Sequence, residues 1–237
     1  GAPHSKVREV SEFLSSVDCD RLIMNGDIID GWQLHNSDDK WNSSHSAFFR
    51  VIMKMMENHS TEVIYVSGNH DDFLDPIVPS KLFNISFVSE YILREEKHSY
   101  VVIHGHAFDS ITARFRWISR LGDIGYNLLL KFNNWWNRAR KRHGKEYYSF
   151  SKVIKHKVKQ AVSLISGFES DLEAFARARG CDGIICGHIH NPEDKMLKGG
   201  IHYLNSGDWV ESLSALVEDF DGNWSILRYN DFVKPQP

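Results

Sequence analysis

The sequence predicts a layered α/β domain that is interrupted by a helical insertion. Helical and strand patterns alternate at short intervals in the first half of the chain. Several short apolar runs end in glycine turns that carry polar side chains, as buried strands do. The chain has 237 residues, of which 42% are hydrophobic, enough for one substantial core. We therefore expect a single domain over residues 1–237, with the insertion at 110–166.

The first four elements are predicted to be a helix, a strand, a helix and a strand. Apolar residues recur at helical spacing over 7–17, which predicts an amphipathic helix. The apolar run at 22–24 predicts a buried strand. Helical spacing returns over 47–56, and a second buried strand follows at 62–66.

Strand patterns dominate after residue 82. Strands are expected at 85–88, 91–93, 100–103, 184–186, 201–204, 214–218 and 224–229. We expect the last three to complete a second sheet. The long helical periodicity at 111–165 separates this second group of strands into two parts.

Four of the predicted strands end in the same kind of polar turn. These turns are Gly26-Asp27, Gly68-Asn69-His70-Asp71, His104-Gly105-His106 and Gly187-His188-Ile189-His190. Ligands of layered α/β folds collect at the carboxyl ends of strands, and glycine permits the tight turns found there. We therefore expect these side chains to meet at one site.

The residue types at these turns are those of a metal centre. Carboxylate and amide oxygens with imidazole nitrogens suit Mn, Fe or Zn, and the lack of cysteine here argues against a structural zinc. One ion would explain four ligands. Two ions that share a bridging Asp would explain more of the polar residues at these turns. Such a pair of ions can clamp the attacking and leaving oxygens of a reaction at phosphorus.

These four turns, in this order, resemble the signature blocks of the calcineurin-like metallophosphoesterases. The longer strings GDIIDGWQL at 26–34 and SGDWVES at 206–212, with the insertion, resemble the bacterial UDP-2,3-diacylglucosamine diphosphatase group of the lipid A pathway. The resemblance implies a four-layer α/β/β/α sandwich with a helical cap. It also implies an enzyme that hydrolyses a UDP-linked acylated sugar to UMP and an acyl-sugar 1-phosphate.

The resemblance also implies roles for individual residues. Asp27 would bridge two divalent ions, Mn²⁺ being expected and Fe²⁺ or Zn²⁺ the alternatives. One ion would be held by Asn69, His104 and His188, and the other by His190. A hydroxide between the ions would attack phosphorus. His70 would donate to a phosphoryl oxygen or the leaving group, and Asp71 or Asp30 would orient it.

This chain departs from the family pattern in two respects. The first block of the family, an Asp-x-His at the end of a first strand, is absent, and the first helix follows Gly1 directly. We expect truncation to have removed that strand. The best-known members of the lipid A branch carry Arg at the place of His70 and Asp at the place of His106.

The insertion carries nearly half of the basic residues of the chain, thirteen of the 28 Lys and Arg. The whole chain has a net charge of −3, yet residues 114–159 hold thirteen Lys and Arg against two acids. This composition fits a cap that holds acyl chains and touches anionic lipid, with the protein cytoplasmic and peripheral to the inner membrane face. Nucleic acid is not expected. The plainer alternative is an amphipathic hairpin whose aromatic rings pack on the body.

Several residues are candidates for binding substrate. They are Trp32, Gln33, Arg114, Trp117, Trp135, Trp136, Arg138 and Trp209. Two other functions stay open: hydrolysis of another nucleotide or lipid substrate, and an inactive scaffold, as the retromer subunit with this fold is by analogy.

Overall fold

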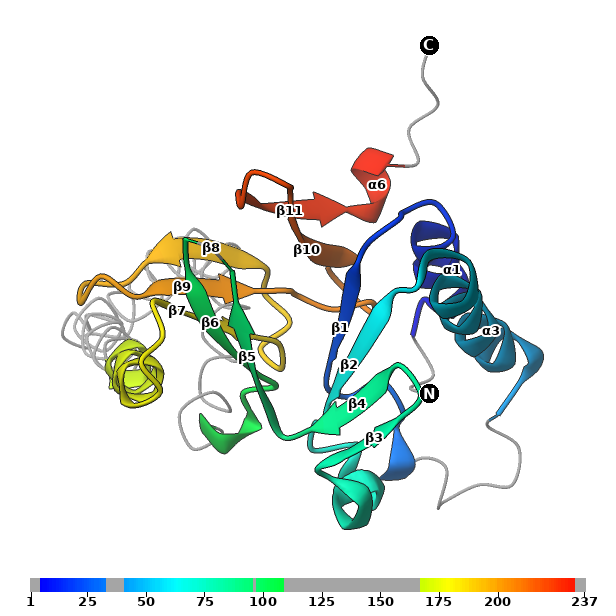
Figure 1. Cartoon of the computed structure of the whole chain (residues 1–237), viewed down its shortest axis with the longest axis horizontal. Coiled ribbons are helices and arrows are strands. Elements are labelled where there is room, and N and C mark those ends of the chain that lie inside the picture. Colours follow the sequence, from blue (N-terminus) through cyan, green and yellow to red (C-terminus); the bar gives the residue numbers. More distant parts are fainter. Residues whose placement is uncertain (1–4, 33–40, 96, 109–166, 233–237) are drawn as a thin grey trace, which may run out of the picture. The chain divides into compact units, whose positions relative to one another are not determined.

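The computed structural model describes residues 5–32, 41–95, 97–108 and 167–232 (Figure 1). The chain divides into one unit of Gly1–His106 with Glu173–Pro237 and another of Ala107–Leu172. All strands and the helices named below belong to the first unit. Two helices cross the boundary between the units: the short helix η2 (His106–Phe108) and a helix at 167–178. The helical insertion expected at 110–166 lies outside the described residues. Within the described ranges, no helix is long and apolar enough to cross a bilayer.

The first sheet contains four strands in the order β1-β2-β4-β3. Strands β1 (Arg21–Asn25), β2 (Glu62–Val66) and β4 (Ile85–Val88) are parallel, and β3 (Ser80–Leu82) is antiparallel to β4. Asn25 lies opposite Val66 in the register of β1 and β2. The turns that follow these two strands therefore begin at the same level of the sheet.

Helices α1 (Val7–Leu14) and α3 (Ser43–His59) pack against one face of this sheet. Their buried side chains share a cluster with three residues of the strands: Phe13, Leu14, Ile52, Met55, Met24, Val63 and Tyr65. Helix α1 ends three residues earlier than the spacing predicts. The hydroxyls of Ser15 and Ser16 bond the carbonyls of Ser11 and Phe13, which ends the regular pattern.

The second sheet contains five strands in the order β5-β6-β7-β9-β8. Strands β6 (Ser99–Ile103), β7 (Gly183–Cys186) and β9 (His202–Asn205) are parallel. The outer strands β5 (Glu90–Arg94) and β8 (Glu193–Met196) are antiparallel to their neighbours. The three parallel strands therefore place their carboxyl ends at the same edge.

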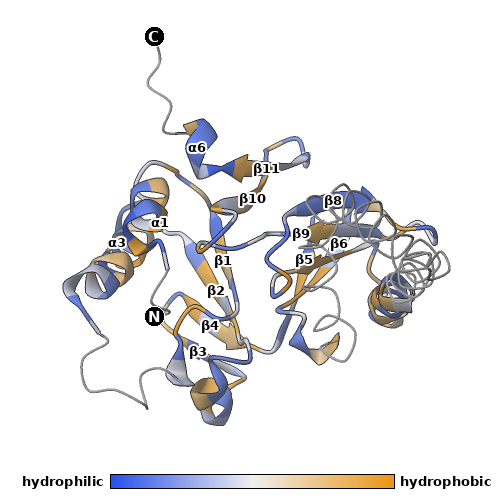
Figure 2. Cartoon of the chain, turned by 180° about the vertical axis from the view of Figure 1, so that it is seen from behind, coloured by the Kyte–Doolittle hydropathy of each residue, from blue (hydrophilic) through white to orange (hydrophobic). Residues whose placement is uncertain are grey.

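A second apolar cluster joins the two sheets. It contains Ile64 and Val66 of β2 together with Val102, Ile185 and Leu204 of the second sheet. Because side chains alternate along a strand, Val63 and Tyr65 of β2 join the helical cluster while Ile64 and Val66 join this one. Figure 2 shows the hydrophobic colouring of β2 and the hydrophilic colouring of the edge strand β8.

The last two strands correct a prediction. Strands β10 (Ser214–Glu218) and β11 (Trp224–Arg228) pair with each other in a separate two-stranded ladder and do not extend the second sheet. The carboxylate of Asp219 stabilises their hairpin turn by accepting from the backbone N–H of Asp221 and Asn223. A short helix α6 (Tyr229–Phe232) follows.

The sequence pattern missed several elements, among them two short strands and one short helix. Strands β3 and β8 have exposed or polar side chains, and the short helix η1 (Asp72–Ile77) contains Pro76. None of the three carries the apolar repeat by which a strand or helix is predicted.

Candidate metal centre

The candidate site is built where parallel strands of both sheets end. Asp27 and Asn69 follow β1 and β2 of the first sheet, and His104 and His188 follow β6 and β7 of the second. The sequence predicted this convergence from the four polar turns.

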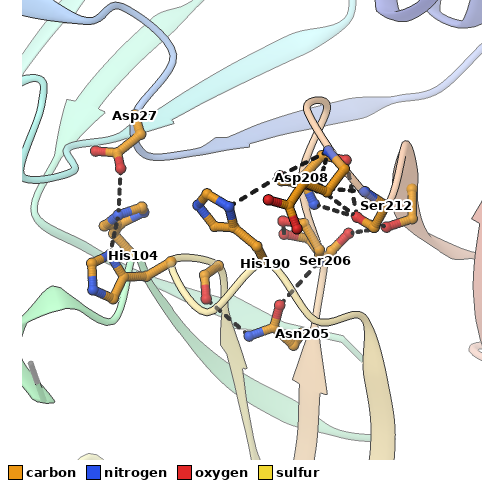
Figure 3. Close-up of polar contacts among 12 residues, drawn as sticks. Asp27, His104, His190, Asn205, Ser206, Asp208 and Ser212 are labelled. Carbon is orange, nitrogen blue, oxygen red and sulfur yellow. Dashed lines mark hydrogen bonds and ion pairs between the residues drawn. The ribbon is translucent and has the colours of Figure 1, made fainter. Parts of the chain in front are cut away.

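Three of the expected ligands lie together. The carboxylate Oδ2 of Asp27 is 3.2 Å from Nε2 of His104, and that nitrogen is 3.2 Å from Nδ1 of His188. Donor atoms of all three lie within 4.8 Å of one another. Figure 3 shows the contact between Asp27 and His104. Both imidazoles are more than nine-tenths buried. The structure thus places two ring nitrogens and one carboxylate oxygen around one point.

A backbone carbonyl determines which ring nitrogen of His104 carries the hydrogen. Its Nδ1 lies 3.0 Å from the carbonyl oxygen of Asn25. A carbonyl only accepts, so Nδ1 carries the hydrogen and Nε2 faces Asp27 and His188. Such a bond on the far ring nitrogen is how proteins orient histidines that bind metal.

The electrostatics of the site favour a cation. Burial alone would raise the pKa of the Asp27 carboxyl, but the hydrogen bond and charge of His104 outweigh it and lower the pKa to about 2. Burial lowers the pKa of His104, whereas the facing Asp27 carboxylate raises it, and the net direction is upward. The carboxylate is thus ionised, and it draws positive charge toward itself.

The side chain of Asn69 gives independent evidence that the site suits a metal ion. Its carbonyl Oδ1 is buried, and among the described residues it has no hydrogen-bond partner. Leaving a buried acceptor unsatisfied costs about 1–3 kcal/mol. A divalent ion would satisfy this oxygen, and amide oxygens are suitable ligands for Mn or Fe as well as Mg. The residues present therefore fit a divalent metal.

The backbone is strained at three of the expected ligands. Asp27, His188 and His190 have φ values of 55°, 60° and 63°, in the left-handed region that non-glycine residues seldom adopt. Strain of this kind is typical of functional sites and costs on the order of 1–3 kcal/mol for each residue.

Two glycines allow the ligands to approach. A Cβ added to Gly26 would lie 2.2 Å from Nδ1 of His104, and one added to Gly68 would lie 2.3 Å from Oδ1 of Asp27. Both positions are therefore closed to any side chain while the ligands hold these places.

Gly26→Ala is expected to abolish high-affinity Mn²⁺ binding, because the new methyl group would displace His104. Gly200→Ala is the matched control: Gly26 and Gly200 have φ of 76° and 82°, but nothing lies within 4 Å of the added Cβ at Gly200. Both variants should lose about 1 kcal/mol of stability from backbone strain. Calorimetric titration measures the Mn²⁺ affinity of both variants. Equal affinity would contradict the expected loss of binding in Gly26→Ala.

His70 lies beside this cluster with its own carboxylate. Its Nδ1 is 3.2 Å from Oδ1 of Asp30, and its backbone N–H donates to Asp27. The ring of Trp32 lies over the imidazole with centroids 4.3 Å apart. Of the two carboxylates predicted to orient His70, Asp30 is the one in contact.

The alternative role for Asp71 is wrong. Its fully buried carboxylate accepts from the hydroxyl of Tyr65 and from the backbone N–H of Ile29 and Gly68. Burial raises the pKa of this carboxyl, opposed by those hydrogen bonds. Asp71 therefore ties the two loops that carry Asp27 and Asn69 and does not contact the ring of His70 through its carboxylate.

His190 is paired with a residue that the sequence analysis missed. Its Nδ1 lies 3.0 Å from Oδ2 of Asp208, which follows the carboxyl end of β9 (Figure 3). The string Gly207-Asp208 after a strand repeats the pattern Gly26-Asp27. That repetition was the signal that could have identified Asp208.

The substrate candidates are only partly covered by the structure. Trp32 is half exposed beside His70, as a residue of the substrate groove would be. Trp209 instead packs against the rings of Phe13 and Tyr229 in the helical core. It is therefore a packing residue, and the prediction that it lines the substrate groove is corrected. The remaining candidates lie outside the described residues: Gln33, Arg114, Trp117, Trp135, Trp136 and Arg138.

Residues 3–192 match the model of the family described as calcineurin-like phosphoesterase. No curated protein matches the chain.

Similar solved structures include a single mutant of Vps29 from Entamoeba histolytica, at 12% identity and TM-score 0.42, covering 96% of this chain and 92% of that one. A novel archaeal phosphodiesterase is similar at 12% identity and TM-score 0.40, with 93% and 90% covered. A dimetal phosphatase from Danio rerio is similar at 13% identity and TM-score 0.36, with 94% and 88% covered.

The family match spans well over half of the chain, and the predicted α/β fold class is confirmed. The matched segment contains the polar turns that follow β1, β2, β6 and β7. The chain belongs to the calcineurin-like phosphoesterase family.

Proposed function

We propose that this protein is a divalent-metal-dependent hydrolase of phosphate esters. The observation that carries the proposal is the convergence of Asp27, His104 and His188, with the buried and unsatisfied oxygen of Asn69. Membership of the calcineurin-like phosphoesterase family supports the same reaction class. A divalent ion at such a site supplies Lewis acidity and lowers the pKa of water near phosphorus.

The residues around the metal ligands have separate tasks in this proposal. His70 lies next to Asp27 through its backbone, and its Nδ1 faces the carboxylate of Asp30. As the imidazolium, which carries a hydrogen on both ring nitrogens, His70 donates the Nε2 proton to the leaving group. Asp27, Asn69, His104 and His188 would hold one ion. His190, with Asp27, would hold a second. We expect Mn²⁺ at both positions, with Fe²⁺ or Zn²⁺ as alternatives.

We propose a nucleotide-linked acylated sugar, similar to UDP-2,3-diacylglucosamine, as the substrate. The strings at 26–34 and 206–212 support this choice, and so does the basic and aromatic composition of 114–159. That composition also supports contact with an anionic membrane surface at the cytoplasmic face. Trp32 beside His70 offers a ring on which part of the substrate could lie.

A comparison of substrates tests both the proposed reaction class and the proposed lipid substrate. The full chain with Mn²⁺ is expected to hydrolyse an acylated UDP-sugar faster than its deacylated analogue, and a chelator should stop both reactions. Equal rates would overturn the lipid substrate but not the hydrolase. Full turnover by metal-stripped protein would overturn metal dependence, and no hydrolysis of these or of simple phosphodiesters would favour a scaffold.

A further inference from the structure

The two carboxylate oxygens of Asp208 share one donor and differ in their other partners. Oδ1 accepts from the backbone N–H of Ser212 at 2.7 Å, from the hydroxyl of Ser212 at 2.8 Å and from the backbone N–H of Glu211 at 3.1 Å. Oδ2 faces Nδ1 of His190 at 3.0 Å and is 3.2 Å from the backbone nitrogen of Glu211, whose N–H is shared by the two oxygens. Three donors thus hold the carboxylate on the side of Oδ1.

Other hydrogen bonds hold the loop that carries Asp208. Its backbone N–H donates to Oγ of Ser212 at 2.8 Å, and the hydroxyl of Ser214 donates to the carbonyl of Ser206 at 2.8 Å. A Cβ added to Gly207 would lie 2.2 Å from Oγ of Ser214, so the chain closes tightly on itself here. The carboxylate therefore cannot turn without breaking several contacts.

Asn205 connects this loop to the turn that carries the histidines. It is fully buried, its side-chain amide donates to the carbonyl of Gly187 at 2.9 Å, and its Oδ1 accepts from the backbone N–H of Gly207 at 2.9 Å. Figure 3 shows Asn205, Ser206, Asp208 and Ser212 in this arrangement with His190. The position of Asp208 relative to His190 is thus set by backbone as well as by side chains.

We infer that Asp208 is a positioning residue that holds His190 as the Nδ1–H tautomer, so that Nε2 presents its lone pair to a divalent cation. An ionised carboxylate only accepts, so the hydrogen of a neutral His190 must be on Nδ1. Only the deprotonated nitrogen of imidazole can bind a metal. The inference rests on the proposed function, because that function assigns the cation to His190.

Asp208→Asn tests the inference sharply. Both bonds from Ser212 go to Oδ1 alone and favour keeping an oxygen there, so the new NH₂ group would face Nδ1 of His190 and donate to it. His190 must then accept at Nδ1 and carry its hydrogen on Nε2, where a metal would bind. The variant is expected to invert the tautomer of His190 and to lower the affinity for Mn²⁺ at one position by about 10- to 100-fold.

The tautomer is measured on metal-free protein by ¹⁵N NMR of the histidine rings, at about pH 8, where histidine is ordinarily neutral. His190→Ala identifies the signals. Wild-type His190 should carry its hydrogen on Nδ1, and finding it on Nε2 would overturn the inference without any variant. Mn²⁺ affinity is then measured by calorimetry.

Two variants serve as controls. Ser212→Ala disturbs the same loop but keeps a carboxylate oxygen facing His190, so the tautomer should not change. Asp219→Asn makes the same chemical change at a hydrogen-bonded carboxylate in the β10–β11 turn and should leave both readouts at wild-type values. Tautomer inversion in Ser212→Ala, or unchanged Mn²⁺ affinity in Asp208→Asn, would overturn the role of the Asp208 carboxylate.

The outcomes separate this inference from the proposed function. Wild-type protein that binds Mn²⁺ and hydrolyses phosphodiesters, with Asp208→Asn equal to it in tautomer and affinity, would overturn the inference alone. Wild-type protein that binds no Mn²⁺ and hydrolyses nothing would overturn the proposed function, whatever the tautomer.

Discussion

His104→Ala is expected to lower kcat/KM for a phosphodiester by at least about 100-fold in the presence of Mn²⁺. Removing only a residue that supports a metal ligand typically costs 10- to 100-fold, and His104 is placed as a ligand itself. It is also the residue whose Nε2 contacts both Asp27 and His188, so its loss leaves two facing groups without their common partner. Initial rates over a range of Mn²⁺ concentrations measure the effect.

The matched control is His59→Ala. His59 lies at the end of α3, its side chain is 45% exposed, and its ion-pair partner is the exposed Asp18. Its replacement should leave kcat/KM within about twofold of wild type, since surface changes away from the site have small effects. Activity of His104→Ala equal to that of His59→Ala would show that the Asp27–His104–His188 cluster does not serve catalysis.

His70→Ala is expected to slow hydrolysis in a way that depends on the leaving group. A positioned general acid contributes roughly 10²- to 10⁴-fold when the leaving oxygen needs a proton. A phosphodiester with an alkyl leaving group should therefore lose that factor. An ester of p-nitrophenol, whose anion leaves without help, should lose much less.

The ratio of these two losses is what identifies the role. Each variant serves as its own control, because both substrates are expected to react at the same site. Asp30→Asn should show the same dependence on leaving group in weaker form, since Asp30 acts through Nδ1 of His70. An equal loss for both substrates in His70→Ala would contradict proton donation and would indicate that His70 only binds the phosphoryl group.

The sequence was sufficient to predict most elements of the fold because their apolar repeats are strong. The buried strands β2, β6 and β7 are almost wholly apolar, and all three were predicted within a residue. Sheet membership was not predictable in the same way. Strands β10 and β11 have the same pattern as the others, and whether they join a sheet or pair alone depends on neighbours far away in the chain.

The cluster of Asp27, His104 and His188 was predictable for a related reason. Each of the three follows a glycine or comes directly after a buried strand, so the local sequence marks it. The roles of two supporting carboxylates were not predictable in this way. Asp71 and Asp208 are distinguished by what they contact, Tyr65 in one case and His190 in the other, and these contacts form only in the folded chain.

Diffraction at the manganese absorption edge, on crystals of the full chain grown with Mn²⁺, tests the central claim most directly. The account predicts an anomalous peak among Oδ2 of Asp27, Nε2 of His104, Nδ1 of His188 and Oδ1 of Asn69, at about 2.0–2.2 Å from its ligands. Mn²⁺-saturated crystals without a peak at that point would contradict the account, even if the ion were bound elsewhere on the chain.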